Sequence, residues 1–246
     1  LASPGEPAPA ARPRQARGWK QSMPDQVPVI TVDGPSGSGK GTVTQRVANR
    51  LDWRVLDSGA LYRLVGYAVE QAGIGFENQI KISQIASKLN VEFSGGRILL
   101  DGAEVTDLIR TETAGNNASK VAAMPGVRAA LLDWQRDYAQ FPGLVADGRD
   151  MGTTVFPQAG VKIFLTASAA ERAQRRYKQL KEKGLSANLA ALTAEIEERD
   201  ARDRSRAASP LVPAPDAIEI DSTAMGIDEV VEMVLQRAHE VFAIPL

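Results

Sequence analysis

The stretch Gly34-Pro-Ser-Gly-Ser-Gly-Lys-Gly-Thr42 decides the fold of this chain. It follows a short apolar run, Pro28 to Val32, that has the composition of a buried strand. It leads into a helical pattern in which Val43, Val47 and Leu51 share one apolar stripe. A glycine-rich loop between a strand and a helix is the context that a phosphate-binding loop requires. The sequence therefore predicts an α/β fold that opens with such a loop.

The loop has each of the parts needed to hold a nucleoside triphosphate. Its glycines let several backbone N–H groups point inward, and the helix N-terminus adds partial positive charge for the β-phosphate. Lys40 adds a full charge for the β and γ oxygens, and Thr42 offers a hydroxyl near the metal, largely through waters. We therefore expect ATP and Mg²⁺ as cofactors. The residues expected to bind the triphosphate are Gly34, Pro35, Ser36, Gly37, Ser38, Gly39, Lys40, Gly41 and Thr42.

One position departs from the plain pattern GxxxxGK[ST], because Gly41 separates Lys40 from Thr42. The GKGT form is typical of monophosphate kinases such as adenylate kinase, whereas GTPases and most ATPases place Ser or Thr directly after Lys. The Asn-Lys-x-Asp signature of GTPases does not occur anywhere in the chain. The loop therefore favours a kinase over a GTPase.

Composition excludes several other classes of protein. With 246 residues, 43% apolar and 24% charged, the chain resembles an ordinary globular protein. Its 29 Lys and Arg against 30 Asp and Glu leave no positive excess for nucleic-acid binding. No apolar run approaches the roughly 18 residues of a membrane span, and the absence of cysteine fits a reducing compartment. We expect a cytoplasmic monomer that binds neither nucleic acid nor membrane.

The first 27 residues differ from the rest, since they contain five prolines and no apolar periodicity. Such a segment cannot nucleate packing, so we expect residues 1–27 to be a disordered extension. Met23 stands just before the first strand-like run and is a candidate native start.

Further apolar runs alternate with helical patterns, which predicts a five-stranded parallel sheet flanked by helices. Polar residues follow these runs, and in a doubly wound sheet the carboxyl ends of the strands form the ligand-binding edge. Between Val91 and Val105, the pairs Gly95-Gly96 and Asp101-Gly102 predict two hairpins and thus a small β insert. The other predicted strands are Arg54 to Leu56, Leu144 to Ala146, Val161 to Leu165 and Ala217 to Ile220, and the residues expected at the edge are Asp33, Asp57, Asp147, Thr166 and Asp221.

A kinase must also hold an acceptor in line with the γ-phosphoryl group, and this requires several converging arginines. Three motifs supply them: Asp57-Ser-Gly-Ala-Leu-Tyr-Arg63, Asp147-Gly-Arg-Asp150 and Glu198-Arg-Asp-Ala-Arg-Asp-Arg-Ser-Arg206. The first places Arg63 on the first turn of a helix, and the last places Arg199, Arg202 and Arg206 near one helical face, which we interpret as part of a closing lid.

Each motif also has an ordinary structural interpretation. The charged tract ending at Arg206 has the composition of a solvated helix with i,i+4 ion pairs. Asp147 could instead cap a helix, and Arg63 could form an ion pair on the surface. The lone His239 is expected on the surface of the last helix. The three motifs occur together with a phosphate-binding loop, and this combination favours the functional interpretation.

Taken with Gly34 to Thr42, these motifs resemble bacterial cytidylate kinases from about Pro28 to the C-terminal helix. The longer forms Leu56-Asp-Ser-Gly-Ala-Leu-Tyr-Arg63 and Ala146-Asp-Gly-Arg-Asp-Met-Gly-Thr153 make the resemblance far more specific than the loop alone. It implies a core domain (28–62, 127–171 and 207–246), a monophosphate-binding domain with the β insert (63–126) and a short helical lid (172–206). It also implies transfer of the γ-phosphoryl group of ATP to CMP or dCMP.

The resemblance further assigns roles to residues at matching motif positions. It implies that Lys40, Arg149, Asp147 and Arg206 are catalytic, with the exact role of Asp147 left open. It implies that Ser58, Arg128 and Asp150 read cytosine, that Ser119, Arg199 and Asp203 hold the sugar, and that Arg63, Arg149 and Arg206 bind the acceptor phosphate. A carboxylate and an arginine suit the amino group and the ring carbonyl of cytosine. A kinase of UMP, AMP or shikimate and a non-catalytic nucleotide-binding regulator remain as alternatives.

Overall fold

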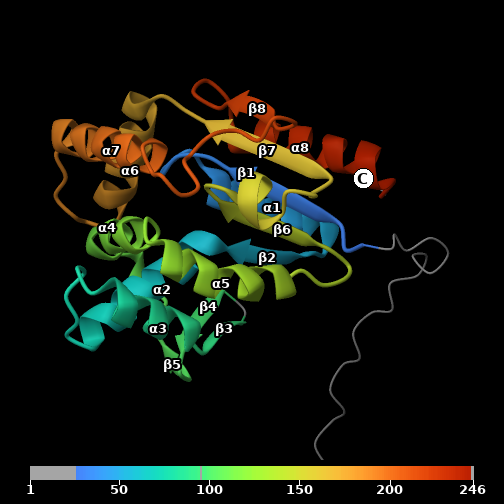
Figure 1. Cartoon of the computed structure of the whole chain (residues 1–246). Coiled ribbons are helices and arrows are strands. Elements are labelled where there is room, and N and C mark those ends of the chain that lie inside the picture. The colour runs from blue at the N-terminus through green and yellow to red at the C-terminus, as the bar shows by residue number, and fades with distance from the viewer. Residues whose placement is uncertain (1–25, 95, 245–246) are drawn as a thin grey trace, which may run out of the picture.

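A computed structural model of the chain describes residues 26–94 and 96–244. Its central sheet has five parallel strands in the order β2-β6-β1-β7-β8 (Figure 1). These strands are β1 (Val29–Asp33), β2 (Arg54–Asp57), β6 (Leu144–Gly148), β7 (Val161–Thr166) and β8 (Ile218–Asp221). β1 is central and wholly buried, as its continuous apolar run requires. The predicted fold class and all five strands are confirmed.

Helices cover both faces of this sheet. On one face the apolar stripes of α1 (Lys40–Leu51) and α8 (Ile227–Phe242) form a core with β1 and β7. On the other face α2 (Ser58–Gln71), α3 (Gln79–Ser87), α4 (Glu112–Val121) and α5 (Pro125–Asp137) form a second core. His239 is exposed on α8, as expected.

The predicted β insert is an antiparallel sheet of three strands, β3 (Val91–Ser94), β4 (Arg97–Leu100) and β5 (Ala103–Glu104). Its second turn needs left-handed backbone at Asp101 and Gly102, and this explains the Asp-Gly pair. With the 3-10 turn η1 (Leu108–Arg110), the insert packs its apolar face on Ala60 and Leu64 of α2. It therefore supports the helix that follows β2.

Two more helices, α6 (Ala169–Glu182) and α7 (Leu189–Arg204), lie beyond the carboxyl ends of the strands, opposite α4 (Figure 1). Ser168 is the N-cap of α6, and its Oγ accepts a hydrogen bond from Glu171 N at 3.2 Å. After β6 the chain makes a single π-helical turn, η2 (Met151–Val155). These segments surround the edge at which the phosphate-binding loop lies.

Three of the predicted domain boundaries fall inside helices: 62/63 in α2, 126/127 in α5 and 171/172 in α6, whereas 206/207 follows the end of α7. The division into core, monophosphate-binding domain and lid stays a prediction. Residues 1–25 lie outside the described part of the chain. The expected disorder of residues 1–27 and the native start at Met23 therefore stay predictions. Within residues 26–94 and 96–244, no helix combines the length and apolarity that crossing a bilayer demands.

Candidate active site

The phosphate-binding loop is shaped by its glycines. Gly37 and Gly39 have φ of 79° and 92°, values that side chains other than glycine rarely adopt. A Cβ on Gly34 would stand 2.0 Å from the Leu165 carbonyl oxygen of β7, so the loop lies directly against the neighbouring strand. The loop ends at Gly39, the N-cap of α1, and Lys40 is the first residue of that helix. The predicted strand, loop and helix are therefore all present in order.

Lys40 and Asp147 face each other at the start of α1. Lys40 Nζ donates to the Pro35 carbonyl at 3.3 Å and lies 3.9 Å from Asp147 Oδ1. Burial lowers the pKa of the Lys40 ammonium and raises the pKa of the Asp147 carboxyl, while each charge stabilises the other. A Cβ on Gly41 would lie 3.2 Å from Asp147 Oδ2. Gly41 therefore leaves room for this carboxylate, which gives the GKGT form a physical reason.

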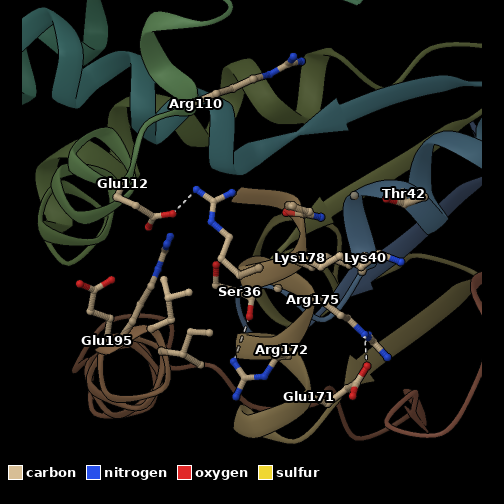
Figure 2. A pocket seen from close by; sticks show the side chains of 18 of the residues that line it. Ser36, Lys40, Thr42, Arg110, Glu112, Glu171, Arg172, Arg175, Lys178 and Glu195 are labelled. Carbon is tan, nitrogen blue, oxygen red and sulfur yellow. Dashed lines mark hydrogen bonds and ion pairs between the residues drawn. The ribbon is translucent and has the colours of Figure 1, made fainter. Parts of the chain in front are cut away.

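A cavity of 730 Å³ opens over this loop (Figure 2). Two arginines of α6 form its floor with the loop: Arg172 Nη1 donates to Ser36 O at 3.0 Å, and Arg175 Nη1 donates to Ser38 O at 3.4 Å. These bonds tie two loop carbonyls to α6, and the backbone N–H groups of a loop of this kind can bind an anion. Thr42 is exposed in this cavity, and Met225, Gly226 and Ile227 form another part of its wall.

Between this cavity and α4, charged side chains of three segments meet. Arg176 of α6 forms an ion pair with Glu112, the first residue of α4 (Figure 2). Arg63 donates through Nη1 to the carbonyls of Ile109 at 2.8 Å and Thr111 at 3.0 Å, and burial lowers its pKa. Arg63 lies on the second turn of α2, one turn later than expected, because α2 already begins at Ser58.

A smaller pocket of 40 Å³ adjoins the first, and Arg199 lines both. It brings together eight of the nine predicted substrate-binding residues, and Arg63 is the exception because it lines the larger cavity. Arg202 lines neither space and lies with its Nη2 3.6 Å from Glu198 Oε1. Arg199 and Arg202 are three residues apart on α7, as expected, whereas Arg206 lies beyond its last residue, Arg204, so the predicted common helical face does not extend to Arg206. The eight are Ser58, Ser119, Arg128, Arg149, Asp150, Arg199, Asp203 and Arg206.

Asp203 is the centre of the hydrogen bonds in this pocket. Its Oδ1 accepts from Ser119 Oγ at 3.1 Å and from Arg206, and its Oδ2 accepts from Arg149 Nε at 3.0 Å. Burial acts to raise the pKa of Asp203, but the arginines around it, Arg149 first, outweigh burial and hold the pKa below its ordinary value. One carboxylate of α7 thus joins Arg149, which follows β6, to Ser119 of α4.

A second carboxylate and an arginine stand at the inner wall of the same pocket. Asp150 and Arg128 form an ion pair in which the carboxylate is nearly fully buried. Arg128 also lies over the ring of Tyr62, with Cζ 5.7 Å from the ring centroid. Ser58, which opens α2, completes this wall. The pocket therefore offers an acceptor and a donor side by side to a planar polar ligand.

The polar residues at the carboxyl ends of the strands differ in what they contact. Asp147 lies at the phosphate-binding loop as expected. Asp57 caps α2 by accepting from Ala60 N at 3.0 Å, and it also lies beside Asp147 in the sheet, where burial and also the Asp57 charge raise the pKa of the Asp147 carboxyl. The Asp221 carboxylate accepts from Thr223 and serves its own turn. Thr166 donates to the Ile220 carbonyl at 3.4 Å. The expectation of one common cluster at this edge is thus met only in part.

Sequence reasoning missed several residues of the site. Arg172, Arg175 and Arg176 had no assigned role, yet all three line the larger cavity, as do Arg110 and Glu112. The available signal was their spacing, since three arginines within five residues of a helix cannot all point to solvent when that helix also packs on the loop. Tyr62 also lines the smaller pocket, but the sequence does not indicate this, because Tyr62 has the helical spacing of the core residues of α2.

A parallel sheet that opens with a phosphate-binding loop, together with an arginine-rich pocket beside it, defines a phosphotransferase of the P-loop kinase class. The model of the cytidylate kinase family matches residues 30–240 of the chain. The chain therefore belongs to the cytidylate kinase family.

Curated relatives agree with this assignment. A cytidylate kinase of Stutzerimonas stutzeri is 55% identical over 217 residues, which cover 86% of this chain and 95% of the relative. A cytidylate kinase of Pseudomonas aeruginosa is 55% identical over 221 residues, covering 87% and 96%. Among solved structures, a shikimate kinase from Bacteroides thetaiotaomicron is similar at 13% identity with a TM-score of 0.44, covering 88% of this chain and 99% of that one.

Proposed function

We propose that the protein transfers the γ-phosphoryl group of ATP to CMP and dCMP, giving ADP and CDP or dCDP. The observation that carries this proposal is the smaller pocket, in which the Asp150–Arg128 pair and the arginines around Asp203 adjoin the phosphate-binding cavity. The pair suits a base that has both an amino group and a ring carbonyl, and the arginines suit its phosphate.

ATP is assigned to the larger cavity, with its phosphates on Gly34 to Thr42 and Lys40. The residues present also fit Mg²⁺, a cation that binds few protein oxygens and keeps several waters. The exposed hydroxyl of Thr42 would hold it, with the Asp147 carboxylate at the edge of the same site. When bound, Mg²⁺ would neutralise charge on the β and γ oxygens.

The acceptor is assigned to the smaller pocket. Ser58, Arg128 and Asp150 would read the base, and Ser119, Arg199 and Asp203 would hold the sugar. Arg63, Arg149 and Arg206 would bind the phosphate between the two spaces. Within the described residues, the buried Nε groups of Arg199 and Arg206 have no hydrogen-bond acceptor. Such donors are costly when left unpaired; a sugar oxygen would satisfy Arg199, and a phosphate oxygen would satisfy Arg206.

The transfer itself requires no strong general base, because a monophosphate oxygen is already a nucleophile. Lys40, Arg149 and Arg206 would neutralise the charge that moves between the two phosphates, and Asp147 would orient Lys40. Closure of the lid, the proposed segment 172–206, would exclude water from both spaces. The protein would act as a cytoplasmic monomer, without nucleic acid or membrane.

Product analysis tests this proposal. With ATP, Mg²⁺ and CMP, the protein should form CDP and ADP in equal amounts, and chelation of Mg²⁺ should stop both. ATP consumption without CDP would contradict the proposal, and so would binding of ATP with no turnover on any acceptor. A kinase of UMP, AMP or shikimate would be identified by the product it makes in the same assay.

A further inference from the structure

Asp33 is a buried carboxylate that the mechanism above does not use. It is the last residue of β1, immediately precedes the phosphate-binding loop, and is only 5% exposed. Its two oxygens accept separate backbone hydrogen bonds, Oδ1 from Met151 N and Oδ2 from Gly152 N, each at 2.8 Å. Both donors belong to the first residues of the turn η2. A side chain at the base of the donor loop therefore holds the segment that follows β6.

These two bonds close a small loop that carries acceptor residues. Asp33 lies beside Gly148 in the sheet register, and the chain then passes through Arg149 and Asp150 before it returns to the Asp33 carboxylate. Asp150 thus lies between two fixed points. Its carbonyl is held as well, since it accepts from Thr154 N at 2.9 Å. Only its side chain is directed away, to the ion pair with Arg128.

The turn also packs tightly on β1. A Cβ on Gly152 would stand 2.9 Å from Thr31 Oγ1 and 3.4 Å from Asp33 Oδ2, so any side chain there would push the turn away from the strand. Thr31 is fully buried and its hydroxyl has no partner among the described residues. It touches the same turn without bonding to it.

A neutral residue would be easier to bury at position 33. Burial is the main cause that raises the pKa of Asp33 to about 7, and the nearby Asp150 and Asp147 charges raise it further against the two backbone bonds. A neutral amide at this position would offer only one acceptor oxygen to two N–H donors. The presence of a carboxylate here is therefore explained by the need to hold both N–H groups of one turn.

We propose that Asp33 is a positioning residue for acceptor recognition: by binding Met151 N and Gly152 N, it sets the place of Asp150 and so the selection of the acceptor base. This inference rests on the proposed function, since it assigns base reading to Asp150 and Arg128. It also links the two sites, because the residue that orients the base reader directly precedes Gly34 of the donor loop.

Three variants test the inference. Asp33→Asn removes one of the two bonds, and Gly152→Ala displaces the turn without changing any charge. Thr31→Val is the matched control, because it is on the same strand, contacts the same turn and removes a hydroxyl that has no partner. For the first two variants we expect the KM for CMP to rise about tenfold, as the loss of a hydrogen bond to a charged group suggests. We expect the preference for CMP over UMP to fall, the KM for ATP to stay within about twofold, and the control to behave as wild type.

Hydrogen exchange supplies a readout that is independent of activity. The Met151 and Gly152 amides should be protected in the wild type and should exchange faster in Asp33→Asn, while amides of α8 stay unchanged. An unchanged CMP:UMP preference in both variants would overturn the inference, as would an equal rise in the KM for ATP or unaltered exchange of the two amides. If Asp33→Asn does not fold, Gly152→Ala alone decides. A wild type that makes no CDP contradicts the proposed function instead, and the two failures are thus distinguishable.

Discussion

Arg172 and Asp200 form a buried, two-armed ion pair that joins α6 to α7. Arg172 Nη1 lies 3.1 Å from Asp200 Oδ1 and Nη2 lies 2.5 Å from Oδ2, with side chains only 3% and 5% exposed. The same Nη1 donates to the Ser36 carbonyl of the phosphate-binding loop. Because Arg172 contacts both the loop and α7, the position of the helix that carries Arg199 and Asp203 is tied to the donor site.

Asp200→Asn should lower the free energy of unfolding by about 3 kcal/mol, because it leaves the Arg172 charge buried without its partner. The matched control is Glu198→Gln on the same helix, which breaks the exposed pair with Arg202 and should cost less than about 1 kcal/mol. Urea unfolding of the two variants measures both values. Equal, small effects of the two substitutions would show that the buried pair does not hold the helices together.

Lys40→Met should reduce kcat by at least about 10²-fold, since it removes a charge that acts on the transferred group. Its melting temperature should change little, because burial already disfavours the charged ammonium and the Asp147 carboxyl, whose pKa burial raises, can become neutral once its partner is gone. Lys81→Met, which removes an exposed lysine of α3 that lines neither pocket, is the control and should keep wild-type rates. Steady-state kinetics and thermal melts check both, and a near-normal kcat for Lys40→Met would exclude the proposed donor site.

Arg206→Ala and Arg202→Ala form a second matched pair, since the arginines lie four residues apart and differ in what they contact. Arg206 reaches Asp203 inside the smaller pocket, whereas Arg202 pairs outside with Glu198. We expect the KM for CMP to rise at least about tenfold in Arg206→Ala, which is about 1.4 kcal/mol, and to change less than twofold in Arg202→Ala. Normal use of CMP by Arg206→Ala would remove this arginine from the acceptor site.

The pH dependence of stability should show the raised pKa of Asp33, about 7 in the folded protein against 3.8 as its ordinary value. Between about pH 4 and 7, Asp33 keeps its proton in the folded protein but has released it in the unfolded chain. The free energy of unfolding therefore decreases as pH rises through this range. Asp33→Asn has no such group. Its stability relative to wild type should therefore increase by more than about 1 kcal/mol from pH 5 to pH 8. A difference that stays constant across this range would show that the pKa of Asp33 is not raised.

The fold was largely predictable because its signals are local. Five buried strands, the loop from Gly34 to Thr42 and the hairpin at Asp101-Gly102 each follow from a few adjacent residues. Gly41 was visible as a departure from a pattern, but its reason, space for the Asp147 carboxylate, depends on a contact between segments far apart in the sequence.

The residues of the candidate site were predictable only where they belong to a recognisable sequence motif. Eight of the residues that the resemblance assigns to substrate binding lie in one pocket, but Arg202 does not line it, and helical spacing alone does not show which side of α7 packs inward. Two other contacts were not predictable: the Arg172–Asp200 ion pair and the hydrogen bond from Met151 N to Asp33. Both join segments that are more than twenty residues apart, and no local sequence pattern encodes such contacts.

The most direct test of the central claim is to measure kcat/KM with CMP, dCMP, UMP and AMP at one fixed concentration of ATP and Mg²⁺. The claim is that the Asp150–Arg128 pocket selects a cytosine base for transfer from the adjacent phosphate-binding loop. It predicts the highest values for CMP and dCMP, with UMP and AMP at least about tenfold lower, and a smaller gap in Asp150→Asn. Equal or higher values with UMP or AMP in the wild type would contradict it.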